Sequence, residues 1–121
     1  MNVVSDSDII IDWLNGVPDA RDALREYERI FVSIITWMEV LVGARTPEAE
    51  AETRTALEAV EVVGLSPVIA EAAVVIRRAS RLRVPDAVIL ATSRTLGLPL
   101  LTRNTRDFDA SDPSIRVPYT L

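Results

Sequence analysis

The stretch Val3-Val4-Ser5-Asp6-Ser7-Asp8-Ile9-Ile10-Ile11 decides the fold, because a short β-branched run stops there at an acid and a helical pattern of apolar residues begins. β-Branched residues favour strands, so the stretch predicts a strand that delivers Asp6 to a strand-to-helix turn. In parallel sheets, ligands bind just beyond the carboxyl ends of the strands, which makes Asp6 well placed for chemistry. The same residue types also serve as ordinary helix N-caps, so Asp6 needs partners to define a site.

Short apolar runs and helical patterns alternate along the rest of the chain. Further strands are expected at residues 30–33, 62–63, 98–102 and 115–117, and helices at 8–14, from 18 onward, and at 36–42, 47–60, 67–81 and 84–97. This alternation predicts an α/β domain in three layers, with a central, mostly parallel sheet of four to five short strands flanked by helices. The 121 residues fit a single domain over residues 1–121.

The residue types that are absent restrict the chemistry more than those that are present. The chain has no Cys, no His and no Lys, and all 13 of its basic residues are Arg. This excludes disulfides, zinc sites with Cys or His ligands, Ser-His-Asp triads, histidine-based RNA cleavage, Schiff bases and the P-loop lysine. Enzyme chemistry would therefore rest on carboxylates, most simply through a hard cation with oxygen ligands such as Mg²⁺ or Mn²⁺.

Four acids occupy positions that a parallel sheet would bring to one edge. Asp6 and Asp107 follow predicted strands, while Glu39 and Asp86 stand in the first turns of helices that follow loops. Strand ends and helix starts of this kind lie on the same edge of a right-handed parallel sheet. Two carboxylates ~4 Å apart repel by about 4 kcal/mol at an effective dielectric of about 20, so a divalent cation is the natural counter-charge for such a cluster.

Two of these acids also have a structural explanation. Thr36-Trp37-Met38-Glu39 matches a capping box, in which the Glu39 side chain returns to the backbone amide of the N-cap residue. Asp86 follows a proline at a helix start, where any acid interacts favourably with the helix dipole. From the residues alone, capping and catalysis are both open for Glu39 and Asp86.

The four acids lie in segments 6–12, 33–43, 85–92 and 101–108, and these segments resemble the motifs of PIN-domain ribonucleases. Their order, their spacing and the chain length are most similar to the VapC-type toxins of bacterial toxin–antitoxin modules. The resemblance covers nearly the whole chain. It implies a PIN-like fold and Mg²⁺-dependent cleavage of RNA, with Mn²⁺ as a possible substitute, by the toxin of a type II module that acts on tRNA or other structured RNA.

The resemblance also implies roles for individual residues. Asp6, Glu39, Asp86 and Asp107 would form the catalytic cluster, with Asp6 and Asp86 as the principal metal ligands. Whether Asn104 or Asp107 completes the cluster is open, because some relatives carry an acid at the position of Asn104. Asp8 stands where Ser or Asn is usual, and it would be either a helix N-cap or an additional outer contact to the metal. The side chains expected to contact the substrate are Ser7, Arg103, Asn104 and Arg106.

Partners follow from the resemblance and from the distribution of charge. The family implies a small VapB-type antitoxin, whose tail occupies the active-site groove, and a homodimer. The net charge is −5, but residues 1–76 carry 5 Arg against 14 acids, and residues 77–121 carry 8 Arg against 4 acids. Aromatic residues make up only 5% of the chain, so backbone contacts from Arg77, Arg78, Arg81, Arg103 and Arg106 are expected to hold RNA better than base stacking would. With no long apolar run and no basic leader, a cytoplasmic protein is expected.

Two other functions fit parts of the sequence. Asp6-Ser7-Asp8 after an apolar strand also matches the opening of haloacid-dehalogenase phosphohydrolases, in which the first Asp is a nucleophile. The short chain and the missing Lys count against that chemistry. A non-catalytic binding domain would retain the same acids as helix caps and surface charge.

Overall fold

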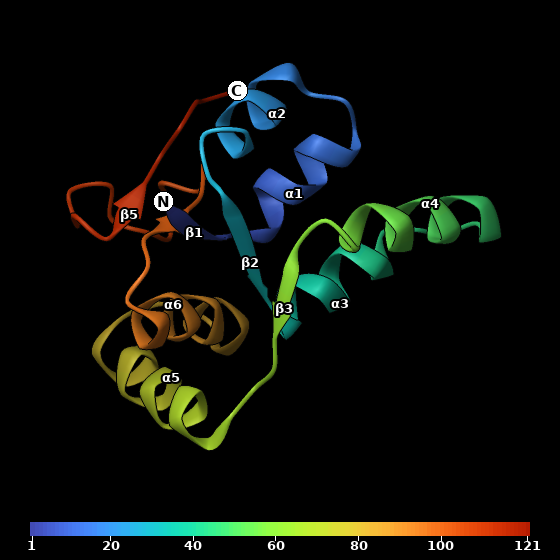
Figure 1. The fold of residues 1–121 in the computed structure, drawn as a ribbon. Helices are drawn as coiled ribbons and strands as arrows, with labels where there is room; N and C mark the ends of the chain where they lie inside the picture. The colour runs from blue at the N-terminus through green and yellow to red at the C-terminus, as the bar shows by residue number, and fades with distance from the viewer.

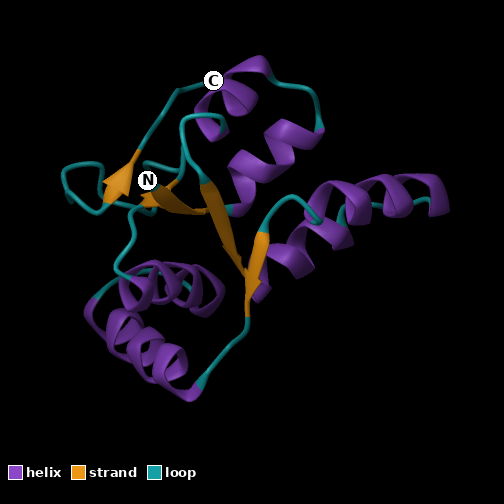
Figure 2. Cartoon of the chain, viewed as in Figure 1, coloured by secondary structure: helices purple, strands orange, loops and turns teal.

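A parallel sheet with helices on both faces forms the centre of the molecule (Figure 1, Figure 2). The computed structural model describes residues 1–121. The strands are β1 (Asn2–Ser5), β2 (Arg29–Ser33), β3 (Glu61–Val63), β4 (Leu100–Leu101) and β5 (Ile115–Arg116). The helices are α1 (Ser7–Leu14), α2 (Pro18–Leu24), α3 (Ile34–Val42), α4 (Pro47–Leu57), α5 (Pro67–Ala79) and α6 (Val84–Leu96). The predicted α/β fold class with a parallel sheet is confirmed.

The order of the strands determines where a site can form. All pairings are parallel, and the order across the sheet is β3-β2-β1-β4-β5. The chain therefore builds outward from β1 through β2 to β3, and then returns through α5 and α6 to place β4 on the other side of β1. A reversal of this kind is a topological switch point, where the segments that follow two adjacent strands diverge and leave a crevice. The segments that follow β1 and β4 begin at Asp6 and Thr102.

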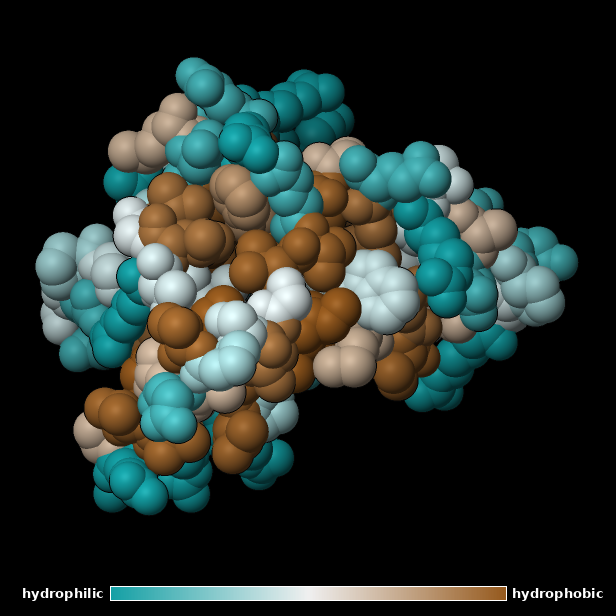
Figure 3. All heavy atoms as spheres, turned by 60° about the horizontal axis from the view of Figure 1, so that its bottom comes forward, coloured by the Kyte–Doolittle hydropathy of each residue, from teal (hydrophilic) through white to brown (hydrophobic).

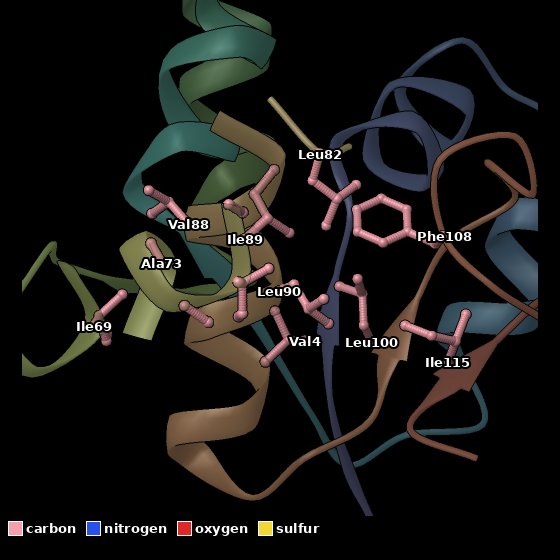
Figure 4. Packing of buried hydrophobic residues seen from close by; sticks show 13 residues of the cluster. Val4, Ile69, Ala73, Leu82, Val88, Ile89, Leu90, Leu100, Phe108 and Ile115 are labelled. Atoms are coloured by element: carbon pink, nitrogen blue, oxygen red, sulfur yellow. The ribbon is translucent and has the colours of Figure 1, made fainter. Parts of the chain in front are cut away.

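Alternation along the central strands divides the core into two sides. Val4 and Leu100 belong to a cluster of 13 buried residues beneath α5 and α6, and Figure 4 shows their side chains pointing toward α6. Their neighbours Val3 and Leu101 pack instead with Ile9 of α1 and with α2. Successive side chains of a strand point to opposite faces, so two adjacent residues anchor both helical layers.

The remaining helices complete the second layer. Val32 of β2 packs with Ile10 of α1, Val40 of α3 and Leu57 of α4. Ile9 and Ile10 are both fully buried, because α1 contacts the sheet on one side and the α3–α4 pair on the other. This packing fixes the start of α1, and therefore Asp6, against the end of β1.

The helix boundaries differ from the predicted ones in one informative place. Helix α3 begins at Ile34, and Ser33 is its N-cap, with the Ser33 hydroxyl accepting a hydrogen bond from the Ile35 amide at 3.1 Å. The predicted capping box at Thr36 and Glu39 is therefore wrong, since Thr36 lies inside the helix. The strand residue Ser33 caps the helix because β2 runs into α3 without a loop.

The face of α5 that turns away from the sheet is apolar and exposed. Val68 and Val75 are 65% and 64% exposed, and Leu65 and Val84 beside them are also more than half exposed. Figure 3, which turns this side of the molecule toward the viewer, shows apolar side chains gathered there. None of the six helices has the length and apolar character that crossing a membrane requires.

Candidate active site

Asp6 lies in the turn between β1 and α1 and is the N-cap of α1. Its Oδ1 accepts a hydrogen bond from the Ser7 amide at 2.7 Å, and its Oδ2 accepts one from the Thr102 hydroxyl at 2.8 Å. Only 5% of the residue is exposed, and no basic side chain is bonded to it. Burial, followed by the charge of Asp8, raises the pKa of Asp6 to about 7, although both hydrogen bonds favour the ionised form.

Thr102 connects this carboxylate to the segment after β4. The Asp6 amide donates to the carbonyl of Leu101, which continues the β1–β4 pairing one residue beyond the end of β1. The Thr102 hydroxyl accepts from the Asn104 amide at 3.0 Å while it donates to Asp6. Adjacent ends of β1 and β4 therefore hold the Asp6 side chain in one orientation.

Asp8 lies in the first turn of α1 and is not its N-cap, so the predicted capping role of Asp8 is wrong. Its Oδ2 accepts a hydrogen bond from the Arg103 amide at 3.2 Å, while its Oδ1 is buried without any hydrogen-bond partner. Burial raises the pKa of Asp8 against the opposing effect of that amide. A buried carboxylate oxygen without a donor is costly unless a cation or a proton accompanies it.

Glu39 reaches the same region from beyond the middle of α3, and not from the first turn where it was expected, because the helix begins at Ile34. The Ser7 hydroxyl lies 2.7 Å from Glu39 Oε1 and 3.0 Å from the Thr36 hydroxyl. These contacts join α1 to α3, so Ser7 orients Glu39 and is itself buried. The second carboxylate oxygen of Glu39 has no protein partner, and the residue is exposed to solvent.

Asp86 and Asp107 complete the group from α6 and from the segment after β4. Burial raises the pKa of Asp86, and the nearby charges of Asp107 and Glu39 raise it further, while Arg83 acts in the opposite direction. Asp86 and Asp107 line one pocket of about 300 Å³. Asp86 is also close enough to Asp6 to contribute to its raised pKa. Of the four acids expected at one edge of the sheet, Asp86 therefore lies within electrostatic reach of the other three.

The structure separates the roles of Asn104 and Asp107. The side-chain amide nitrogen of Asn104 donates to Asp107 Oδ2 at 3.0 Å, and the backbone amide of Asp107 donates to Asn104 Oδ1 at 3.2 Å. Asp107 lines the pocket with Asp86, and Asn104 does not. Asn104 thus positions the carboxylate of Asp107.

Arg103 is engaged inside the protein. Its guanidinium binds both carboxylate oxygens of Asp12, at 2.6 and 3.1 Å, and the Tyr119 hydroxyl donates to Asp12 Oδ2 at 2.8 Å. The guanidinium of Arg103 holds the pKa of Asp12 below its usual value. Of the four side chains expected to contact substrate, Ser7, Arg103 and Asn104 are bonded within the protein. The Arg106 side chain alone has no such partner.

The donor set fits a divalent cation in its chemistry. All the ligands on offer are carboxylate oxygens, which Mg²⁺ and Mn²⁺ prefer, and the unpaired Asp8 oxygen lies among them. No three acidic side chains are arranged so that they could hold an ion as they stand. Loading the site would therefore require carboxylates to turn toward one another.

The sequence alone did not identify several residues of the site. Thr102 and Thr36 hold other site residues through their hydroxyls, and Asp12 and Tyr119 fix Arg103. Arg83 lies three residues before Asp86, and its charge lowers the pKa of Asp86. Only Arg83 could have been recognised, from its place in the turn that precedes Asp86.

The fold and the site together define a class of protein: a parallel α/β domain with acids gathered at the carboxyl edge of its sheet. The family model for the PIN domain matches residues 3–112, and the chain belongs to the PIN-domain family. The resemblance noted in the four acidic segments is thereby confirmed. Nothing in the fold or the family match supports the haloacid-dehalogenase alternative.

Solved structures agree with this assignment. A chain of a toxin–antitoxin complex from Klebsiella pneumoniae is 41% identical, with a TM-score of 0.92, over 98% of this chain and 99% of that one. DNA-bound VapBC from Salmonella typhimurium matches at 24% identity and a TM-score of 0.77, over 96% of each chain. VapBC2 from Rickettsia felis, bound to a promoter DNA fragment, matches at 16% identity and a TM-score of 0.79, over 95% of this chain and 96% of that one. No curated protein matched the sequence.

Proposed function

We propose that this chain is the toxin of a type II toxin–antitoxin module and that it cleaves RNA by metal-dependent hydrolysis. The observation that carries the proposal is the gathering of Asp6, Glu39, Asp86 and Asp107 at one edge of the sheet, with Asp6 buried and bonded to no basic side chain. Membership of the PIN family and the likeness to a chain of a toxin–antitoxin complex support it. The substrate class would be tRNA or another structured RNA in the cytoplasm.

Each acid has a distinct part in the proposed reaction. Asp6 and Asp86 would hold Mg²⁺ or Mn²⁺, and a bound ion of this kind lowers the pKa of water and shields charge on the phosphodiester. Glu39 is fixed through Oε1 by Ser7, so its second oxygen is available to take a proton from the attacking water. Asp107, positioned by Asn104, would complete the site directly or through water.

The supporting hydrogen bonds determine how these carboxylates are oriented. Thr102 and the Ser7 amide fix the two oxygens of Asp6, which preorganises the most buried ligand before any ion binds. The Arg103 amide similarly fixes one oxygen of Asp8, whose other oxygen would be available for an outer contact to a bound ion. Ligands held by such secondary contacts bind metal more tightly and in a defined geometry.

The cleavage assay compares the purified chain with matched variants. Wild-type protein is expected to cut a total tRNA pool in the presence of Mg²⁺ or Mn²⁺ and to lose that activity in EDTA. Asp6→Asn and Asp86→Asn should abolish cleavage while the circular dichroism spectrum stays native. Asp19→Asn is the matched control, because Asp19 is an exposed acid on α2 with no bonded partner, and it should cut at the wild-type rate. Undiminished cleavage by the Asp6→Asn protein would refute the mechanism.

The proposal includes two protein partners. A VapB-type antitoxin would occupy the active-site groove and present a basic side chain to the carboxylates, so its co-expression should relieve growth arrest caused by the wild-type chain.

A second copy of this chain would cover the exposed apolar face of α5. Light scattering of the isolated chain should then give the mass of a dimer, and Val75→Asp should give a monomer. A monomeric wild-type chain that becomes part of a larger assembly only with antitoxin would assign that face to the antitoxin instead.

A further inference from the structure

Three arginines surround two acids of the site, Asp86 and Asp107. The pocket of about 300 Å³ that contains Asp86 and Asp107 is otherwise lined only by Arg81, Arg83 and Arg106. No apolar side chain takes part in its walls. The pocket therefore combines carboxylates and guanidinium groups beside the site that would perform the chemistry.

Two buried residues hold the walls of this pocket together. Leu82 and Phe108 both belong to the core beneath α6, and Figure 4 shows the Leu82 side chain pointing toward the Phe108 ring. Leu82 lies between Arg81 and Arg83, which are exposed, and Phe108 directly follows the exposed Arg106-Asp107 pair. Burial of these two apolar side chains thus places the charged residues on either side of them at the rim of the pocket.

The three guanidinium groups have no partner within the protein. None of them takes part in an ion pair, and none forms a side-chain hydrogen bond, whereas Arg94 and Arg103 are each bound to an aspartate. Arg83 influences the pKa of Asp86 without coming within ion-pair distance of it. Their donors are thus free for an external anion, and they lie next to the acids without being neutralised by them.

We propose that Arg81, Arg83 and Arg106 hold a backbone phosphate of the RNA next to the bond that is cut. The guanidinium fork matches the oxygens of a phosphate and can bind two of them at once. A pocket with no apolar wall suits a phosphate better than a nucleobase or the side chains of a peptide. This inference deepens the proposed function and rests on it for the position of the cut bond.

The test measures how RNA affinity depends on salt. A phosphate contact to single-stranded RNA contributes roughly 0.7 to the slope of log K against log[salt], because binding releases a condensed counterion. Fluorescence anisotropy would follow a short fluorescein-labelled single-stranded RNA binding to the Asp6→Asn protein, which does not cut the probe. Measurements in EDTA at several salt concentrations give the slope for each variant.

Each arginine removed should reduce both the affinity and the slope. Arg83→Gln is expected to lower the slope by part of this ~0.7, and the variant that combines Arg81→Gln, Arg83→Gln and Arg106→Gln by about 0.7, because the three side chains share one phosphate. Loss of one charge-assisted contact should weaken binding about tenfold at low salt. Arg83→Lys keeps the charge and should restore the slope, with only part of the affinity. Arg25→Gln is the matched control, since Arg25 is exposed at the end of α2 and lines no part of this pocket, and it should bind like the parent.

The outcomes separate this inference from the proposed function. An unchanged slope in Arg81→Gln, Arg83→Gln and Arg106→Gln would overturn it, even if the wild-type chain cuts RNA. Competition by millimolar inorganic phosphate that is equally strong in the wild type and in these variants would also contradict it, because the phosphate site would then lie elsewhere. If the arginine variants show a reduced slope but the wild-type chain cuts no RNA, the RNA-binding pocket is supported and the proposed nuclease activity is refuted. Variants that retain RNA binding and lose only the antitoxin would show that the pocket serves an acidic peptide.

Discussion

Replacing the buried acid at the centre of the site should stabilise the metal-free protein. Asp6 is 5% exposed, its two oxygens are hydrogen-bonded, and its pKa is raised to about 7 by burial and by the charge of Asp8. An Asp6→Asn side chain can keep these contacts. Its carbonyl oxygen would accept from the Ser7 amide, and its amide nitrogen would donate to the Thr102 hydroxyl. That hydroxyl can turn its own proton toward Asp8 Oδ2, which lies 3.4 Å away.

The magnitude follows from the two pKa values. A carboxyl group with a pKa of 3.8 in the unfolded chain and about 7 in the folded one binds its proton more tightly when folded. The resulting stability is fully present below the unfolded pKa, is lost as pH rises between the two values, and is absent above the folded one. Each pKa unit corresponds to ~1.4 kcal/mol, so the stability that the Asp6 carboxyl group contributes at low pH is reduced by about 4 kcal/mol at pH 8 and by less than 2 kcal/mol at pH 5.

Urea unfolding followed by circular dichroism in EDTA provides the measurement. The free energy of unfolding of Asp6→Asn should exceed that of the wild type by up to ~4 kcal/mol at pH 8, and the excess should fall by more than half at pH 5. Asp19→Asn should show no such pH-dependent difference. Adding Mg²⁺ at pH 8 should raise the stability of the wild type and leave that of Asp6→Asn unchanged. A loss of stability in Asp6→Asn that is equal at both pH values would refute the reasoning, because it would mean that Asp6 acts as a helix cap and nothing more.

Four other substitutions test the supporting structure. Arg103→Gln leaves the buried Asp12 charge without its ion pair and should destabilise the fold by about 2 to 3 kcal/mol in thermal or urea unfolding, since Arg103 itself is partly exposed. Tyr119→Phe removes one hydrogen bond to the same charged group and should cost about 1 to 2 kcal/mol, with a native circular dichroism spectrum as the control. Gly97→Ala should destabilise by about 1 kcal/mol because Gly97 ends α6 at a φ of 67°, whereas Gly43→Ala, at a φ of −73°, should be neutral or stabilising. Equal effects of the two glycine substitutions would contradict the conformational argument.

The sequence predicted the fold well because its signals are local. β-Branched runs, prolines at helix starts and the glycine after α6 each act over a few residues, and the elements appear close to where these signals place them. The start of α3 was missed because Thr36 matches a capping box, whereas Ser33, three residues earlier, was expected only as the last residue of a strand. Only the absence of a loop after β2 decides between them.

The contacts that orient the site could not be predicted, because they join residues that are distant in sequence. Asp12 and Arg103 are 91 positions apart, and Asp12 and Tyr119 are 107 apart. Their pairing depends on β4 lying beside β1, and two-residue parallel strands carry no signal for that order. The acids themselves were recognisable because a parallel sheet brings strand ends and helix starts to one edge whatever the strand order.

Direct measurement of metal binding tests the central claim, which is that these carboxylates form a divalent-cation site. Titration calorimetry of the wild-type chain with Mn²⁺ at pH 8 should give a saturable heat. Asp6→Asn and Asp86→Asn should each lose most of it, and Asp19→Asn should retain it. A wild-type chain that binds no Mn²⁺, or one whose binding survives both Asp6→Asn and Asp86→Asn, would contradict the account.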